Sequence, residues 1–184
     1  MKFDDFAQLV RTRRSQLIVD QDRDVEIDLI NQLCSVATWA PNHQQTWPWV
    51  FGVFTGESRR RLSNATADAM QRNGDLEMKV TKTRTKYLRA PVVVIVGSAP
   101  GESALQNEEN RDAVAAGIQN MLLGATAMGL ASFWSSCPKG CNDAVARHCG
   151  FASGTHVTAI IYIGWPTKDL PAIERPAPAI TYFN

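Results

Sequence analysis

The sequence lacks a large net charge, a long apolar run and a signal peptide. Its 19 lysines and arginines almost balance its 18 aspartates and glutamates, so the net charge is only +1 and predicts no nucleic-acid or membrane-surface partner. The longest apolar run, residues 90–96, is too short to cross a bilayer. The opening residues include Lys2, Asp4 and Asp5 and lack the continuous apolar stretch of a signal peptide.

Cysteine is also scarce. The chain has only Cys34, Cys137, Cys141 and Cys149, and without a signal peptide we expect a cytoplasmic protein whose thiols are free. A zinc protein is one alternative, because Cys137 and Cys141 come close to the spacing of a structural zinc site. His148 and Cys149 are adjacent, however, which makes tetrahedral ligation by both awkward.

The familiar nucleotide-binding and hydrolase motifs are absent as well. The sequence contains no GxGxxG before a helix, no GxxxxGK(S/T) loop, no HExxH and no GxSxG. A nucleotide phosphate, if one is bound, must therefore be held by side chains rather than by a glycine-rich loop.

What remains has the composition of one globular domain. Of the 184 residues, 45% are hydrophobic, which suits a single domain over residues 1–184 with its own core. Hydrophobic periodicity predicts helices at residues 3–12, 25–39, 58–73, 76–89, 110–128 and 142–148, and strands at 49–54, 91–96, 131–134 and 155–165.

Several of these elements have a predicted environment. The run of Val and Ile at 91–96 is typical of a fully buried strand, and the Ala, Gly and Leu content of 110–128 indicates a buried central helix ended by Gly129. The helices at 58–73 and 76–89 are charged and expected to be exposed. Asp24 is expected to cap the helix at 25–39, and Pro41 to stop it.

The C-terminal extension, from about residue 166 to 184, is rich in proline and ends in the β-prone segment Ile180-Thr181-Tyr182-Phe183. Proline favours an extended chain, so we expect this end to reach a sheet edge, either its own or a partner's. A frayed terminus is the alternative.

Three segments carry candidate chemistry. Arg13-Arg14-Ser15 follows the first helix and is suited to gripping a phosphate, although a solvated basic helix end has the same composition. The loop Ala40-Pro41-Asn42-His43, followed by Trp47-Pro48-Trp49, is suited to reading a planar heterocycle, or else packs as core. The segment from Ala131 to Cys137 could line one face of a flat ligand, or be an ordinary buried strand.

Taken in order, these pieces resemble the flavin-dependent nitroreductase family, and within it the small single-domain YdjA-type branch. The segments that carry the resemblance span nearly the whole chain: Arg13-Arg14-Ser15, Ala40-Pro41-Asn42-His43, Pro48-Trp49, Arg89-Ala90-Pro91, Gly129-Leu130, Phe133-Trp134, Tyr162-Ile163-Gly164-Trp165-Pro166 and Thr181-Tyr182-Phe183.

The resemblance implies an α+β fold with a mixed, mainly antiparallel sheet flanked by helices. It also implies a homodimer that binds FMN at the subunit interfaces and exchanges its C-terminal tail. The activity implied is transfer of hydride from NAD(P)H through FMN to a nitroaromatic, a quinone or a similar flat acceptor by a ping-pong mechanism. That chemistry requires no catalytic acid, base or nucleophile from the protein.

The family's cofactor contacts map onto several positions of this chain. The phosphate and ribityl contacts correspond to Arg13, Arg14 and Ser15, and the loop near the isoalloxazine to His43. Lys82 falls where a basic residue approaches the pyrimidine end of the flavin. The strand that backs the ring from the other subunit corresponds to Phe133, Trp134 and Ser135.

The chain also departs from the family pattern. Trp39 stands where the most similar members have an arginine, Leu17 where many have a basic residue, and Ser135 where the small branch can use an arginine on the phosphate. Arg175, or Lys139, is expected to supply a replacement cation. Gln45 and Trp47 also replace the Asn and Gln that many members have before Pro-Trp, and together with Trp39 and Ser135 they favour the alternative that the protein is a flavin-binding module without turnover.

Overall fold

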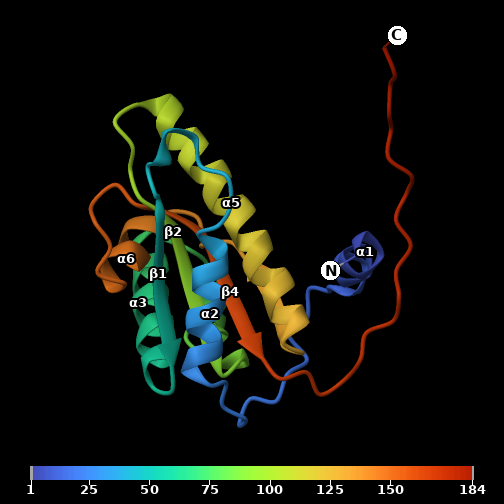
Figure 1. Ribbon diagram of the computed structural model, residues 1–184. Coiled ribbons are helices and arrows are strands. Elements are labelled where there is room, and N and C mark those ends of the chain that lie inside the picture. Colours follow the sequence, from blue (N-terminus) through green and yellow to red (C-terminus); the bar gives the residue numbers. More distant parts are fainter. Residues whose placement is uncertain (1, 184) are drawn as a thin grey trace.

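The computed structural model describes residues 2–183 and is built on a four-stranded sheet with helices on both faces (Figure 1). The strands are β1 (Trp49–Thr55), β2 (Val92–Ser98), β3 (Ala131–Ser135) and β4 (His156–Gly164). Their order is β1-β2-β4-β3, and every neighbouring pair is antiparallel. Among the described residues, the one parallel contact is an isolated bridge between Ser15 and Ser132. The expected α+β fold with a mainly antiparallel sheet is confirmed.

The helices are α1 (Phe3–Thr12), α2 (Ile27–Ala37), α3 (Ser58–Arg72), α4 (Glu77–Thr83), α5 (Ala104–Ala127) and α6 (Asn142–His148), with 3-10 turns η1 (His43–Gln45) and η2 (Lys86–Arg89). None of the helices within residues 2–183 is both long enough and apolar enough to cross a membrane.

Strand β2 forms the centre of the molecule, as its run of Val and Ile predicts. All seven of its residues are buried, and alternate side chains enter two separate cores because successive residues of a strand point to opposite faces. Val92, Val94 and Val96 pack with α2 and α5, whereas Val93 and Ile95 pack with α3, η2 and α6.

Helices α2 and α5 approach each other closely at two glycines of α5. A Cβ atom at Gly117 would lie 2.5 Å from the carbonyl oxygen of Ala37 and 2.6 Å from Nε1 of Trp49. That indole also donates a hydrogen bond of 3.3 Å to the carbonyl of Ala113. At Gly124 the nearest obstacle is only the flexible side chain of Leu33, at 2.9 Å. The two helices can therefore pack at this distance only because α5 has no side chain at position 117.

We expect Gly117→Ala to destabilise the protein by about 1–3 kcal/mol, the usual cost of overpacking a core. The new methyl group would meet backbone rather than a movable side chain. Gly124→Ala is the matched control, since Leu33 can shift and alanine improves helix propensity by up to about 1 kcal/mol. Urea denaturation of both variants measures the difference. Equal stability of the two would contradict this account of the helix contact.

Four local expectations were wrong. Helix α3 is not simply exposed, because it buries six residues against the sheet: Leu62, Ser63, Thr66, Ala67, Ala69 and Met70. The helix expected at 76–89 is interrupted after Thr83, and η2 then buries Tyr87. Asp24 does not cap α2, which begins at Ile27 after Glu26. Helix α5 begins at Ala104 rather than 110, because the Ser103 side chain accepts a hydrogen bond from the Gln106 amide.

Helix α1 and the part of the tail around residues 172–175 lie side by side, away from the sheet (Figure 1). Helix α1 buries none of its residues, and its apolar Phe3 is 78% exposed. The tail is extended, as expected, and residues 171–183 are exposed. Among residues 2–183 its final β-prone segment pairs with no strand of its own chain. Both ends thus present apolar side chains that this chain does not cover.

Candidate functional site

The segment Arg13-Arg14-Ser15 leaves the end of α1 and runs beside the edge strand β3. Arg13 has extended backbone angles (φ −56°, ψ 130°), so the helix stops at Thr12. Ser15 then bridges to Ser132, and the amide of Gln16 donates a 2.9 Å hydrogen bond to the Ser132 carbonyl. The backbone contact with β3 fixes the position of these three residues relative to the sheet.

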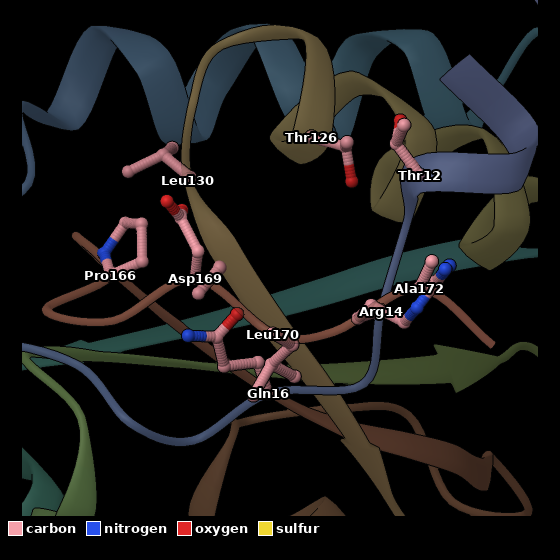
Figure 2. Close-up of a pocket in the computed structure, with 10 residues that line it drawn as sticks. Thr12, Arg14, Gln16, Thr126, Leu130, Pro166, Asp169, Leu170 and Ala172 are labelled. Atoms are coloured by element: carbon pink, nitrogen blue, oxygen red, sulfur yellow. The ribbon is translucent and has the colours of Figure 1, made fainter. Parts of the chain in front are cut away.

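Arg175 of the tail joins this segment. A cavity of about 350 Å³ is lined by Arg13, Arg14, Ser15, Leu170, Pro171, Ile173 and Arg175. We call it the phosphate pocket, and we call Arg13, Arg14 and Arg175 the arginine cluster. A neighbouring cavity lies between the tail and the end of α5, and Arg14 lines it together with Asp169 (Figure 2). The structure thus brings the predicted Arg175 together with the predicted Arg13-Arg14-Ser15.

The phosphate pocket is electropositive. Within the described part of the chain, no aspartate or glutamate lines it. Burial lowers the pKa of Arg13, and the positive charges of Arg175 and Arg14 lower it further. One guanidinium nitrogen of Arg14 donates to the carbonyls of Arg11 and Arg13, while its Nε is buried without a hydrogen-bond partner in the described structure. Guanidinium groups without acidic partners, beside a serine hydroxyl, are the donor set that a phosphate monoester requires.

Phe133, Trp134 and Ser135 lie on β3, directly after the residue that bridges to Ser15. Phe133 is partly buried, with its ring edge-on to Tyr162 at 6.1 Å between centroids, and Trp134 is 37% exposed. The resemblance assigns this segment to the other subunit. In the structure Phe133 follows directly on Ser132, which bridges to Ser15, and the expected contact with the other subunit's cofactor stays a prediction. An aromatic strand edge therefore adjoins the phosphate pocket.

Lys82 and Lys86 differ in burial. Lys82 is exposed in the last turn of α4, whereas Lys86 of η2 is partly buried. Burial lowers the pKa of Lys86, and so does Arg89, while Cys137 just beyond β3 acts in the opposite direction. The charge of Lys86 is thus within interaction range of Cys137, and the role of Lys82 stays a prediction. The sequence offered a single weak signal for Lys86, a further lysine four positions after Lys82.

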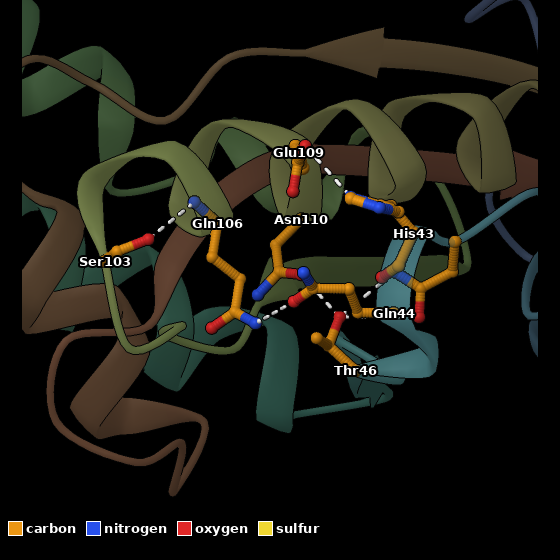
Figure 3. A network of polar contacts seen from close by, with 8 residues as sticks. His43, Gln44, Thr46, Ser103, Gln106, Glu109 and Asn110 are labelled. Atoms are coloured by element: carbon orange, nitrogen blue, oxygen red, sulfur yellow. Dashed lines mark hydrogen bonds and ion pairs between the residues drawn. The ribbon is translucent and has the colours of Figure 1, made fainter.

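The loop that contains His43 is held in a strained conformation (Figure 3). Gln44, Gln45 and Trp47 have φ values of 57°, 54° and 48°, in the left-handed region that costs non-glycine residues roughly 1–2 kcal/mol each. The Asn42 side chain accepts a 2.8 Å hydrogen bond from the Trp47 amide. Such strain persists only where surrounding contacts enforce it, and it is concentrated at functional sites.

The first turns of α5 provide those contacts. Nδ1 of His43 lies 3.0 Å from Oε1 of Glu109, Gln44 bonds Gln106 at 3.0 Å, and Thr46 donates to Asn110 (Figure 3). Positions 106, 109 and 110 share one face of the helix. The His43 side chain remains 63% exposed, so the loop presents it at the surface of this chain.

Within one chain, His43 is far from the arginine cluster. Its partner Glu109 lies near the start of α5, whereas Thr126, at the end of α5, lines the cavity beside Arg14. These positions are separated by about 25 Å along the helix, at about 1.5 Å per residue. Trp39, between α2 and the loop, is 83% exposed. The structure therefore gathers Arg13, Arg14, Ser15, Arg175 and β3 on one side and leaves His43 and Trp39 elsewhere.

All four cysteines are free. Burial raises the pKa of Cys34 to about 11 and those of Cys137 and Cys149 to about 12. Among residues 2–183, no group of three His, Cys, Asp or Glu side chains is placed to hold a metal ion, so the zinc alternative gains no support. The expected reducing, cytoplasmic environment stays a prediction.

The raised thiol pKa values predict alkaline instability. In the folded protein Cys137 and Cys149 keep their protons to about pH 12, whereas unfolded thiols lose theirs near 9.0. The resulting stabilisation is complete below about pH 9 and is lost as the pH rises toward about 12. We expect the free energy of unfolding in urea to fall over this range, and to fall less in Cys137→Ala. An identical pH profile for the variant would contradict the contribution assigned to Cys137.

Both the sequence and the fold are similar to those of known proteins. The model of the nitroreductase family matches residues 10–165. The chain belongs to the nitroreductase family. The match runs from the end of α1 through Trp165 and includes Arg13-Arg14-Ser15, the His43 loop and β3. In Escherichia coli K12 the protein named "Putative NAD(P)H nitroreductase YdjA" is 24% identical over 148 residues, which cover 78% of this chain and 81% of that protein.

Solved structures of the nitroreductase family share the fold. A nitroreductase-like family protein from Bacillus cereus superposes with a TM-score of 0.81 and 28% identity, covering 96% of this chain and 94% of that one. A nitroreductase with bound FMN from Bacteroides fragilis superposes with a TM-score of 0.74 and 21% identity, covering 97% and 98%. The second likeness is one of fold alone.

Proposed function

We propose that this nitroreductase-family protein is an FMN-dependent oxidoreductase. It uses NAD(P)H as donor and reduces a small, flat acceptor such as a nitroaromatic or a quinone. The observation that carries the proposal is the phosphate pocket, in which the arginine cluster and Ser15 lie beside the aromatic edge of β3. A cationic pocket next to an exposed aromatic edge matches the two unlike ends of FMN, a phosphate and a flat ring.

In this proposal each group has a separate task. The arginine cluster and Ser15 hold the phosphate, Phe133 and Trp134 support the ring, and Lys86 supplies a positive charge beside it. Bound FMN would accept a hydride from the nicotinamide and deliver it to the acceptor after the donor has left, which is a ping-pong order. A cation next to the ring favours the negative charge that reduction creates. The protein's contribution is orientation and electrostatics rather than acid–base chemistry.

The proposal includes a homodimer in which each site is completed by the second copy. Helix α1 and the tail expose apolar residues that their own chain leaves uncovered, among them Phe3 at 78% and Phe183 at 92%. His43 and the arginine cluster lie toward opposite ends of α5, so one chain cannot place both against one cofactor. A twofold arrangement with antiparallel α5 helices would bring the partner's loop to the cluster, because such an interface uses the same surface of both copies.

A second candidate function is a flavin-binding module without turnover. The observation that favours it is the 83% exposed side chain of Trp39, which stands where the family resemblance implies an arginine. A large indole beside the ring can cover the face that donor and acceptor need. In this reading the phosphate pocket still binds FMN, but hydride transfer does not follow.

The experiment that separates the two functions is anaerobic mixing of the FMN-loaded protein with NADH or NADPH. Bleaching of the flavin absorbance, followed by its return on adding a quinone, supports the oxidoreductase. A retained flavin that neither donor bleaches supports the module. Failure of the apoprotein to bind FMN in a fluorescence titration would overturn both.

A further inference from the structure

The arginine cluster borders a second cavity that extends past Arg11. This cavity has a volume of about 530 Å³ and is lined by Val10, Arg11, Thr12, Arg13, Arg14, Ala172, Ile173 and Arg175. It shares all three arginines of the cluster with the phosphate pocket. Ser15 lines only the phosphate pocket, and Arg11 lines only the larger cavity. We call the part of the larger cavity at Arg11 the Arg11 lobe.

The two cavities together hold more positive charge than one phosphate can balance. Four guanidinium groups line them, each permanently charged, and no aspartate or glutamate of the described residues lines either cavity. Within residues 2–183, none of the four arginines takes part in an ion pair. A phosphate monoester carries a charge of about −1.5 to −2 at neutral pH. With FMN bound, roughly two positive charges would remain uncompensated.

Arg11 is free to meet a second anion. Its carbonyl, not its side chain, is engaged, as the acceptor of a hydrogen bond from Arg14. Its guanidinium donates no hydrogen bond within the described structure, and the residue is exposed in the last turn of α1. Attraction to the C-terminal dipole of α1 explains one cation at this position, worth roughly 0.3–1 kcal/mol. It does not explain three further guanidiniums around the same cavity.

We propose that the Arg11 lobe binds a phosphate group of the dinucleotide donor. The proposal rests on the proposed function, because it assumes that FMN occupies the phosphate pocket and that NAD(P)H enters beside it. Arginine recognises phosphate through its planar fork of N–H donors. Both the 2′-phosphate of NADPH and the pyrophosphate of either dinucleotide offer phosphate oxygens to such a fork. A 2′-phosphate site would select NADP⁺ over NAD⁺, whereas a pyrophosphate site would bind both.

The test uses FMN-loaded protein and the oxidised dinucleotides NADP⁺ and NAD⁺, which bind without turnover, titrated by calorimetry. We expect Arg11→Gln to weaken NADP⁺ binding about tenfold or more, the loss of one charged hydrogen bond. A loss confined to NADP⁺ assigns the 2′-phosphate to the lobe. An equal loss for both dinucleotides assigns the pyrophosphate. Arg72→Gln, an exposed arginine of α3 outside both cavities, is the matched control.

Two results would overturn the proposal while leaving the proposed function intact. One is unchanged affinity of Arg11→Gln for both dinucleotides. The other is a loss of FMN affinity in Arg11→Gln as large as that in Arg13→Ala, which would make Arg11 part of the cofactor phosphate site. If the wild-type apoprotein binds no FMN in the fluorescence titration, the proposed function is wrong. The Arg11 proposal, which depends on it, is then wrong as well.

Discussion

Arg13→Ala is expected to weaken FMN binding by about tenfold to a hundredfold. The side chain lines the phosphate pocket, and the pocket offers no lysine to replace it. Loss of a hydrogen bond between charged groups costs about 1.5–3 kcal/mol, and each 1.4 kcal/mol is about tenfold in the dissociation constant. Fluorescence titration of the apoprotein with FMN measures the change directly.

The matched control for Arg13→Ala is Arg72→Ala. Arg72 lies at the end of α3 and is exposed, so it tests the effect of removing one positive charge from the protein as a whole. We expect its FMN affinity to equal that of the wild type. Raising the salt concentration should reduce the difference between Arg13→Ala and the wild type, because screening weakens exposed charge contacts. Unchanged FMN affinity in Arg13→Ala would remove this residue from the site.

The sequence predicted the sheet well because its strands are patterned by burial. Strand β2 is a continuous run of Val and Ile from Val92 to Val96, which indicates burial on both faces, and the structure places it between two cores. Helix boundaries were less predictable. The charged pattern at 76–89 has helical spacing, but Tyr87 is buried in the core beside the sheet, and the chain leaves the helix at Arg84 to place it there. Tertiary packing decided that boundary.

The candidate site was only partly visible in the sequence. Arg13-Arg14-Ser15 is contiguous and could be recognised as a motif, whereas Arg175 is more than 150 residues away and joins it only because the tail folds back. Arg11 was missed, since only cavity geometry separates it from other cations of the chain. The contact between Thr46 and Asn110 joins residues 64 apart in sequence. No local sequence pattern predicts this contact.

Mixing two variants of lowered activity should restore part of the activity if the sites lie between subunits. Arg13→Ala removes a phosphate contact and His43→Ala removes the side chain that the strained loop presents. In the proposed dimer these residues serve one site from different chains. A heterodimer then contains one intact site and one doubly damaged site. Random pairing in a twofold dimer places about a quarter of all sites in the intact class.

The measurement is NAD(P)H-dependent quinone reduction after the two variants are unfolded together and refolded with FMN. We expect about a quarter of the wild-type rate from the mixture, against the low rate of each variant refolded alone. Mixing Arg13→Ala with Arg175→Ala is the control, because both residues line the same pocket of one chain and every heterodimer site is then damaged. Equal rates from the two mixtures would mean that His43 does not serve a site on the partner. Restoration confined to the first mixture would assign the arginine cluster and the His43 loop of each site to different chains, as the length of α5 between them requires.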